Sequence, residues 1–261
     1  MEPTLRNPAR VRLEAGELAL GVGIRQSRTV DIAAIMKACG YDWLFLDLEH
    51  NSMDLDTAVQ ISVAALGAGI APIVRVPAGQ FWLATRVLDG GALGIVMPHV
   101  DTAEEAREIA DRLRYPPQGH RSVAGGLPHF GYAPISTGAA CAALNAATLV
   151  VVMLETPTAI ANAGAIAAVP GIDSLLIGTS DLTMELGIPG QLGDERVVDA
   201  YRAVVEACRA HGKYAGIGGV YEEGLMCRYI GMGVRLVLGG GDLGFMTAAA
   251  SARAKVLREL R

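Results

Sequence analysis

The sequence is poor in lysine and aromatic residues, and its cysteines form no cluster. The four cysteines (Cys39, Cys141, Cys208 and Cys227) are far apart, with no CxxC or Cys/His pattern. Their spacing therefore gives no indication of a cysteine metal site. We expect reduced, mostly buried thiols in a cytoplasmic protein.

Long apolar runs and basic stretches are also missing. No apolar run approaches the ~20 residues of a membrane-spanning helix, and the N-terminus has no apolar core typical of a signal peptide. The formal net charge is −5, with no concentrated basic patch. We therefore expect neither a membrane nor a nucleic-acid partner. Only 5% of the residues are aromatic and 51% are hydrophobic, with abundant alanine and glycine, which is typical of helices packed closely on a parallel sheet.

Short apolar runs alternate with stretches of helical period. Predicted strands cover residues 18–25, 43–50, 70–77, 93–100, 148–156, 173–181, 214–219 and 235–242. Helical stretches follow them; the one at 102–115 opens with a capping box of Thr102 and Glu105. Eight such units predict one domain over residues 1–261, a (β/α)8 TIM barrel. The alternative is an open doubly wound sheet, which is disfavoured because no GxGxxG follows the first strand.

Residues 116–147 interrupt this alternation. They are rich in glycine and proline and show no period. We expect an elaborated loop, and a loop of this length in a compact domain is often functional.

Polar side chains follow several of the predicted strands. The second strand ends in Asp47 and His50, the third in Arg75, the fifth in Glu155 and the sixth in Asp181. Catalytic groups of a (β/α)8 barrel lie at the carboxyl ends of its strands. These residues are therefore expected to meet on one rim.

Glu155 and Asp181 are predicted to lie at the ends of neighbouring strands, which are ~4.8 Å apart. Two carboxylates this close repel each other unless a proton or a cation lies between them. Hard oxygen ligands favour Mg²⁺ or Mn²⁺. The alternative is that each carboxylate caps the helix that follows it.

His50 is a candidate general base, which Asp47 and Glu49 could orient. A purely structural histidine is the alternative. His99, in PHV, is a second candidate at the end of the fourth strand. His211 precedes the seventh strand and is expected on the opposite rim.

Arg75 interrupts the apolar run IVRVP. A buried arginine needs an anionic partner. Either it forms an internal ion pair with Asp47 or Glu155, or it stabilises a developing oxyanion or enolate.

The segment IGTSDL offers the backbone N–H groups of Gly178, Thr179 and Ser180 at the start of a helix. Such groups bind a carboxylate or phosphate. An ordinary helix N-cap uses the same residue types.

The chain has only three lysines, Lys37, Lys213 and Lys255, and none ends a predicted strand. A Schiff-base mechanism therefore lacks its nucleophile. Carbanion chemistry at this rim would have to rest on a metal ion.

The stretches WLFLDLEH, PIVRVP, RYPPQGHR, MLET and IGTSDL together resemble the HpcH/HpaI aldolase family, the metal-dependent pyruvate aldolases, over about residues 18–245. The resemblance implies reversible aldol cleavage of a 4-hydroxy-2-oxo acid to pyruvate or hydroxypyruvate plus an aldehyde. It implies Mg²⁺, Mn²⁺ or Co²⁺ as cofactor. It also implies a homohexamer, a trimer of dimers, with the last helix exchanged between neighbouring barrels.

The resemblance also assigns roles to individual residues. Glu155 and Asp181 match the metal ligands, and Ser180 and Asp181 the positions that hold the donor carboxylate. His50 matches the base and Arg75 the residue that stabilises the enolate. Asp89, in RVLDGGALG, matches an aspartate that raises the basicity of the histidine.

The sequence departs from the family pattern at several positions. Met153 stands where a glutamine is often found, Gly23 near the place of a bulky tryptophan, and Gly218 in place of a leucine. Ser180 replaces an alanine. Together these changes predict a wider and differently polar pocket.

Three other functions stay open. A lyase of the citrate or malyl-CoA lyase kind would need a basic patch for CoA, for which only Arg114 and Arg121 are near the rim. A barrel that binds metal without catalysis is the second. The third is a phosphate-sugar enzyme, for which GIGGV and LGGGD offer glycines after the seventh and eighth strands.

Overall fold

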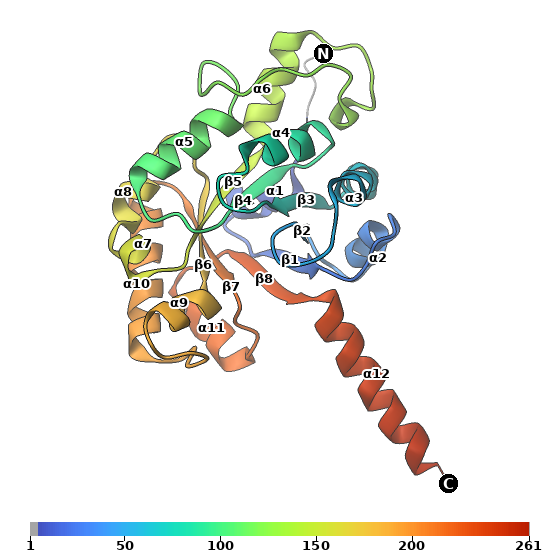
Figure 1. Cartoon of the computed structure of the whole chain (residues 1–261), viewed down its shortest axis with the longest axis vertical. Helices are drawn as coiled ribbons and strands as arrows, with labels where there is room; N and C mark the ends of the chain where they lie inside the picture. Colours follow the sequence, from blue (N-terminus) through green and yellow to red (C-terminus); the bar gives the residue numbers. More distant parts are fainter. Residues whose placement is uncertain (1–4, 261) are drawn as a thin grey trace.

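The computed structural model describes residues 5–260 and confirms the (β/α)8 barrel. Eight parallel strands close in chain order, β1 beside β2 and finally β8 beside β1 (Figure 1). The strands are β1 (Ala19–Ile24), β2 (Trp43–Asp47), β3 (Ala71–Arg75), β4 (Gly94–Met97), β5 (Leu149–Leu154), β6 (Ser174–Gly178), β7 (Tyr214–Gly218) and β8 (Leu236–Gly241). The prediction of one domain over 1–261 includes residues 1–4 and 261, which lie outside the described residues.

Helices follow the strands, and all but the last of them cover the outside of the barrel (Figure 1). They are α2 (Ile32–Ala38), α3 (Leu55–Ala68), α4 (Phe81–Asp89), α5 (Ala103–Leu113), α6 (Thr137–Ala147), α7 (Pro157–Ala161), α8 (Ala163–Ala167), α9 (Thr179–Glu185), α10 (Glu195–Ala210), α11 (Glu223–Met232) and α12 (Asp242–Glu259), with α1 (Pro8–Glu14) before the first strand. The capping box predicted for α5 is present, since the Thr102 and Glu105 side chains each accept a backbone N–H of the other residue.

The core has two layers. One lies between the strands and the surrounding helices. The other fills the inside of the barrel, where Ala9 and Leu13 of α1 pack beneath the strand side chains. Trp43 points inward and needs the space beside Gly21, because a Cβ on Gly21 would lie 2.1 Å from the indole. The barrel is therefore a packed core that is closed at its amino-terminal end.

Alternation along each strand decides which side chains reach the inside. Trp43 and Phe45 of β2 belong to the inner layer, so Asp47, two residues further on, also faces inward. In the same way, Ile73 of β3 belongs to the inner layer, so Arg75, two residues further on, also faces inward. Asp47 and Arg75 are direct partners in the β2–β3 register. The uppermost inward positions of the barrel are thus charged.

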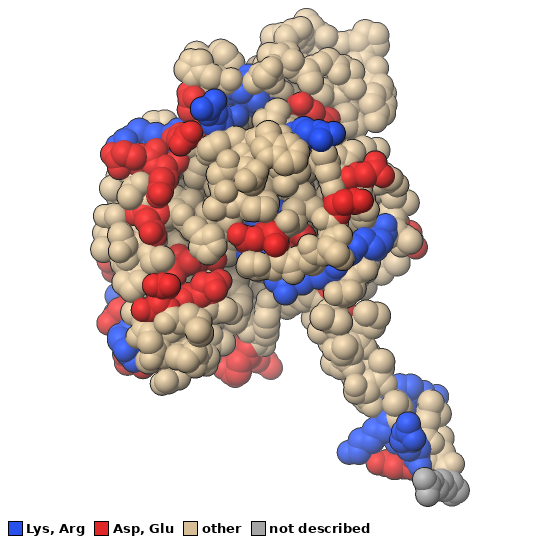
Figure 2. All heavy atoms as spheres, viewed as in Figure 1, with Lys and Arg blue, Asp and Glu red and all other residues tan. Residues whose placement is uncertain are grey.

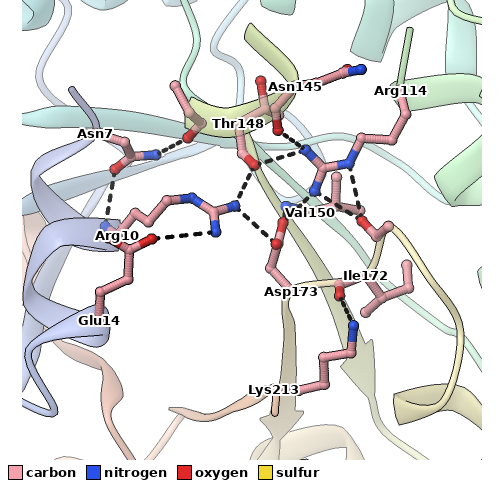
Figure 3. Close-up of polar contacts among 12 residues, drawn as sticks. Asn7, Arg10, Glu14, Arg114, Asn145, Thr148, Val150, Ile172, Asp173 and Lys213 are labelled. Atoms are coloured by element: carbon pink, nitrogen blue, oxygen red, sulfur yellow. Dashed lines mark hydrogen bonds and ion pairs between the residues drawn. The ribbon is translucent and has the colours of Figure 1, made fainter. Parts of the chain in front are cut away.

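The opposite rim is held by a polar network around Asp173 (Figure 3). Asp173 Oδ1 accepts a hydrogen bond of 2.8 Å from Arg10 Nη2, and Asp173 Oδ2 accepts from Arg114 and from the Val150 N–H. The Lys213 ammonium donates to the carbonyl oxygen of Ile172 at 2.7 Å. This network joins α1, α5, β5 and the residues before β6, far from the carboxyl ends of the strands.

Two expectations about individual segments are wrong. Residues 116–147 are not one loop, because the alanine-rich stretch at their end forms α6 and a 3-10 turn covers Pro128–Phe130. The thiols are free, as predicted, but only Cys208 is buried, whereas Cys39 and Cys227 are exposed in the isolated chain. The cytoplasmic location stays a prediction.

Beyond its first turn, the last helix does not pack on its own barrel. α12 projects away from the strands (Figure 1), and among its residues only Asp242 is buried. Its exposed apolar residues include Leu243, Phe245, Val256 and Leu257. Basic side chains gather at its far end (Figure 2). No helix within residues 5–260 is both long and apolar enough to cross a membrane.

Candidate active site

Arg75 and Asp47 form the buried centre of the site. Arg75 Nε donates to Asp47 Oδ1 at 2.9 Å, and Arg75 Nη2 donates to Asp47 Oδ2 at 2.6 Å. The third nitrogen, Nη1, lies 3.0 Å from Glu49 Oε2. The guanidinium also lies over the Phe45 ring, 5.1 Å from its centroid. Of the two partners considered from the sequence, Asp47 is therefore the one that Arg75 pairs with, and Glu49 is added.

The charge state of Asp47 follows from these contacts. Burial alone would raise the pKa of its carboxyl group, but the hydrogen bonds and charge of Arg75 oppose this effect. The backbone N–H groups of Glu49 and His50 also bond to the carboxylate, and the net result is a pKa below the ordinary value. Asp47 is thus ionised and fixes both Arg75 and the turn that carries His50.

His50 lies just past β2, with its side chain 53% exposed. Its backbone N–H donates to Asp47 Oδ1 at 3.3 Å, and its ring Nε2 lies 3.7 Å from Glu49 Oε2. Asp47 therefore orients the backbone of His50, and Glu49 lies beside its imidazole. The ring is free to reach a proton on a bound molecule.

Glu155 follows β5 and is 2% exposed. Its Oε2 accepts the His99 backbone N–H at 2.8 Å and lies 3.1 Å from His99 Nδ1. Burial raises the pKa of Glu155; His99 opposes this, whereas the charges of Asp181 and Glu49 add to it. A Cβ on Gly178 would lie 2.6 Å from Glu155 Oε1, so a glycine is needed here.

Neither acidic residue is a helix cap, which was the alternative reading. Thr156, not Glu155, caps α7 with its side chain. The N-cap of α9 is Gly178, without a side-chain hydrogen bond, and Asp181 lies in the first turn. The Thr179 hydroxyl is occupied by Tyr201 and by the carbonyl oxygen of Gly218. The Thr179 hydroxyl is therefore not available to a ligand, and Thr179 can contribute only its backbone N–H to the site.

The two carboxylates fit a hard divalent cation. Burial, and to a smaller extent the charge of Asp181, raise the pKa of Glu155, and a cation between the two carboxylates would favour their ionised forms. Oxygen donors of this kind suit Mg²⁺ or Mn²⁺. Across residues 5–260 no three His, Cys, Asp or Glu side chains are grouped as a metal cage. Within these residues, Glu155 and Asp181 are two carboxylates that could hold such a cation, and water or substrate oxygens would complete the coordination.

A cavity of about 370 Å³ opens at this rim. It brings together six of the predicted residues, and they are His50, Arg75, Gly178, Thr179, Ser180 and Asp181. Gly218 lines it as well, whereas Gly23 lines an adjoining cavity of about 440 Å³ and Met153 is buried in the barrel.

The sequence interpretation missed Arg25, which lines both cavities. The signal was available, since Arg25 is a charged residue directly after the apolar run of β1. Glu49 was considered only as a residue that orients His50, although it also contacts Arg75 and His99.

Asp89 is not beside His50 within one chain. It is the last residue of α4, shortly before β4 begins, and its Oδ1 accepts a 2.6 Å hydrogen bond from Arg121 Nη2. Helices of this fold run antiparallel to the strands, so the end of α4 lies towards the amino ends of the strands. The contact implied by the family resemblance is therefore absent from the single chain described over residues 5–260.

The two arginines considered for a CoA patch are occupied elsewhere. Arg114 pairs with Asp173 and its side chain is 3% exposed. Arg121 pairs with Asp89 and is 1% exposed. Buried guanidiniums with carboxylate partners are not available to a CoA phosphate, so this expected support for a thioester lyase is removed.

Comparison with known proteins agrees with this geometry. The family described as HpcH/HpaI aldolase/citrate lyase matches residues 25–229. A 4-hydroxy-4-methyl-2-oxoglutarate aldolase of Hapsidospora irregularis is 41% identical over 81% of this chain and 79% of its own length. A hydroxypyruvate/pyruvate aldolase of Cupriavidus necator is 33% identical over 97% of this chain and 93% of its own.

Solved structures give the same result. The crystal structure of an HpcH/HpaI aldolase from Desulfitobacterium hafniense superposes with a TM-score of 0.91 at 27% identity, covering 97% of each chain. The family match covers the strands that carry His50, Arg75, Glu155 and Asp181. The chain therefore belongs to the HpcH/HpaI aldolase/citrate lyase family.

Proposed function

We propose that this protein is a divalent-metal-dependent aldolase, a carbon–carbon lyase that cleaves and forms 4-hydroxy-2-oxo acids. The donor product is pyruvate or hydroxypyruvate, and the other product is an aldehyde or ketone. The observation that carries this proposal is the shared cavity, in which Arg75, His50 and Asp181 face the same space of about 370 Å³.

The substrates of the relatives support this reaction. Two of them are named for the cleavage of 4-hydroxy-4-methyl-2-oxoglutarate, and others for pyruvate or hydroxypyruvate. All of these compounds are 2-oxo acids, and aldol cleavage of 4-hydroxy-4-methyl-2-oxoglutarate yields pyruvate as the donor. The family match covers residues 25–229, which include His50, Arg75, Glu155 and Asp181, and this supports the same chemistry for this chain.

Glu155 and Asp181 would hold the cation. When bound, a divalent cation supplies Lewis-acid polarisation of the keto and carboxylate oxygens of the oxo acid. The cofactor we propose is Mg²⁺, Mn²⁺ or Co²⁺. Among residues 5–260, no lysine lines the cavity to form a Schiff base instead.

Arg75 places a fixed positive charge at the cavity wall. In the cleavage direction, His50 accepts the proton of the C4 hydroxyl while the C3–C4 bond breaks. The electron pair of that bond moves to C3 and gives the enolate of the donor, and C4 becomes a carbonyl. Arg75 stabilises the enolate oxygen, and C3 then takes up a proton to give the free 2-oxo acid.

Gly178, Thr179 and Ser180 would bind the donor carboxylate through their backbone N–H groups, beside Asp181. Their position at the start of α9 supports this role. The complete set of charged and proton-transferring residues also favours an active enzyme over a barrel that only binds metal.

The experiment that tests the proposed function is release of pyruvate from a 4-hydroxy-2-oxo acid with Mg²⁺, Mn²⁺ or Co²⁺ present. Cleavage should stop when a chelator is added. His50→Ala should lower kcat by about 100-fold or more, as expected for loss of a general base. His211→Ala is the matched control, because His211 follows α10 on the opposite rim. No cleavage with any of the three metals would contradict the function.

The assembly we propose is a homohexamer in which α12 packs on a neighbouring copy. The exposed apolar side chains of α12, such as Phe245 and Leu257, support this arrangement. Light scattering should then give six times the chain mass of 27.2 kDa. Leu257→Glu should shift the mass downward, and a monomeric wild-type protein would contradict the proposal.

A further inference from the structure

Arg25 occupies the junction of the two cavities at the catalytic rim. It directly follows β1, and its side chain lines both the cavity that holds His50 and Arg75 and the adjoining one of about 440 Å³. The side chain is 47% exposed. An arginine in this place faces any molecule that extends from the first cavity into the second.

The charge of Arg25 is only partly balanced. Arg25 Nε lies 3.2 Å from Asp47 Oδ2, and among the described residues Asp47 is the one carboxylate within 4.0 Å of it. The same carboxylate already accepts two hydrogen bonds from Arg75. Because one carboxylate serves two guanidiniums, Arg25 keeps donors for a further anion.

The surroundings of Arg25 favour a carboxylate. A guanidinium presents a planar pair of N–H donors that matches the two oxygens of a carboxylate. The wall next to it is formed by Gly239, Gly240 and Gly241, which carry no side chains into the cavity. Apolar contacts come from Phe45 and Leu238. Asp242 also lines this cavity, but its carboxylate accepts the backbone N–H groups of Arg25, Gln26 and Ser27. The space therefore suits a short chain that ends in a carboxylate.

The barrel order places this second anion site across the rim from the metal ligands. Glu155 and Asp181 follow β5 and β6, whereas Arg25 follows β1, which lies between β2 and β8. A donor held near β5 and β6 would direct its reacting carbon, C3, towards the centre of the rim. The acceptor half of the substrate would then extend towards Arg25.

We propose that Arg25 binds a carboxylate on C4 of the substrate, so that the enzyme prefers 4-hydroxy-2-oxo acids with two carboxylates. This assignment rests on the proposed aldolase function. In the direction of synthesis, C3 of the donor enolate forms a bond to the keto carbon of a second 2-oxo acid. The electron pair of that carbonyl moves to its oxygen, which takes up a proton from His50. The carboxylate held by Arg25 is unchanged throughout.

A matched pair of substrates tests the assignment. In 4-hydroxy-4-methyl-2-oxoglutarate, C4 carries a methyl and a carboxylate group, whereas in 4-hydroxy-4-methyl-2-oxopentanoate it carries two methyl groups. The measured quantity is kcat/KM for the dicarboxylate divided by kcat/KM for the monocarboxylate, with Mg²⁺ or Mn²⁺. Arg25→Met should lower this ratio by about 30-fold or more, mainly through KM for the dicarboxylate, as expected for loss of a charged hydrogen-bond pair. Arg25→Lys should give an intermediate ratio.

Arg28→Met is the control for loss of a positive charge near the rim. The Arg28 side chain donates to the carbonyl oxygens of Arg25 and Ser27 and lines neither cavity. The Arg28→Met variant should keep the ratio of the two kcat/KM values within about threefold of wild type, because a screened surface charge has a small effect.

The outcomes separate the two claims. If Arg25→Met lowers kcat/KM equally for both substrates, Arg25 only supports Asp47 and the assignment is wrong. A wild-type enzyme that cleaves both substrates equally well also overturns it, while the aldolase function stands. Release of pyruvate from neither substrate by the wild-type enzyme would overturn the aldolase function together with the assignment.

Discussion

Arg75 and Asp47 stand opposite each other on β3 and β2, and two hydrogen bonds of 2.9 and 2.6 Å join the guanidinium to the carboxylate. Neither side chain is accessible enough for water to replace its partner, since Asp47 is 0% and Arg75 4% exposed. The pair is therefore part of the barrel core, and Arg75 also lines the candidate active-site cavity.

Asp47→Asn should destabilise the protein strongly. The change leaves Arg75 buried with only Glu49 as a full counter-charge, and breaking a buried pair costs about 3 kcal/mol. Urea unfolding at pH 7 measures this loss. Glu104→Gln, which removes an exposed ion pair with Arg107, is the control and should unfold at the same urea concentration as wild type.

The loss should depend on pH in a defined direction. The folded-state pKa of Asp47 is lowered from 3.8, so its stabilising contribution is complete above that value and disappears as the pH falls through the folded pKa. The difference between wild type and Asp47→Asn should therefore be constant from pH 7 to about 5 and shrink only below about pH 4. A difference that shrinks between pH 7 and 5 would contradict the lowered pKa.

Arg75→Lys should impair catalysis more than folding. Lysine keeps the positive charge near Asp47 but cannot make the two-pronged contact or hold a fixed donor towards the enolate. We expect kcat to fall by about 100-fold with little change in circular dichroism. Arg235→Lys is the control, because Arg235 bonds to backbone carbonyls at the opposite rim. Activity of Arg75→Lys within threefold of wild type would remove Arg75 from enolate stabilisation.

Glu155→Gln should abolish tight metal binding without unfolding the protein. The substitution keeps the size of the side chain and removes a carboxylate whose ionised form is destabilised by burial and by the charge of Asp181. Calorimetric titration with Mn²⁺ should show an affinity at least about 100-fold lower, while the metal-free protein loses less than about 1 kcal/mol of stability. Glu105→Gln, in the capping box of α5 on the same rim, should bind Mn²⁺ like wild type. Equal affinities for wild type and Glu155→Gln would contradict the assigned ligand.

Much of this site could be predicted from the sequence because the strands are short and their ends are visible. An apolar run that stops at Asp47, Arg75, Glu155 or Asp181 marks the carboxyl end of a strand, and a parallel barrel brings such ends together. The period of two also explains which of these side chains face inward, since Asp47 continues the inner series of Trp43 and Phe45.

What could not be predicted depends on contacts between distant segments. The position of Asp89 on the other rim follows from the direction of α4 and from its bond to Arg121, a residue in a stretch without period. The alanine-rich α6 was hidden because alanine gives no clear contrast between a buried and an exposed face. The sequence places Arg25 at the end of β1, but that it lines two adjoining cavities follows only from the closed barrel, in which β1 pairs with β8.

Asp173→Ala should destabilise the barrel while the folded protein keeps its kcat. Asp173 balances Arg10 and the buried Arg114 at the rim away from the cavity (Figure 3). Removing it leaves a buried guanidinium without a carboxylate, which costs about 3–5 kcal/mol. Thermal unfolding and single-temperature kinetics below the transition measure the two effects. A fall in kcat with unchanged stability would contradict the division of the barrel into a supporting rim and a catalytic rim.

The most direct test of the central claim is metal-dependent exchange of the C3 hydrogens of pyruvate in D₂O, followed by proton NMR. The protein with Mg²⁺, Mn²⁺ or Co²⁺ should replace the methyl hydrogens with deuterium, because the proposed site would form and stabilise the enolate without any acceptor. Exchange should stop with a chelator and in Glu155→Gln, and be slowed by about 100-fold in Arg75→Lys. No exchange by the wild-type protein with any of the three metals, or equal exchange in Glu155→Gln, would contradict a metal-assisted enolate site between Glu155, Asp181 and Arg75.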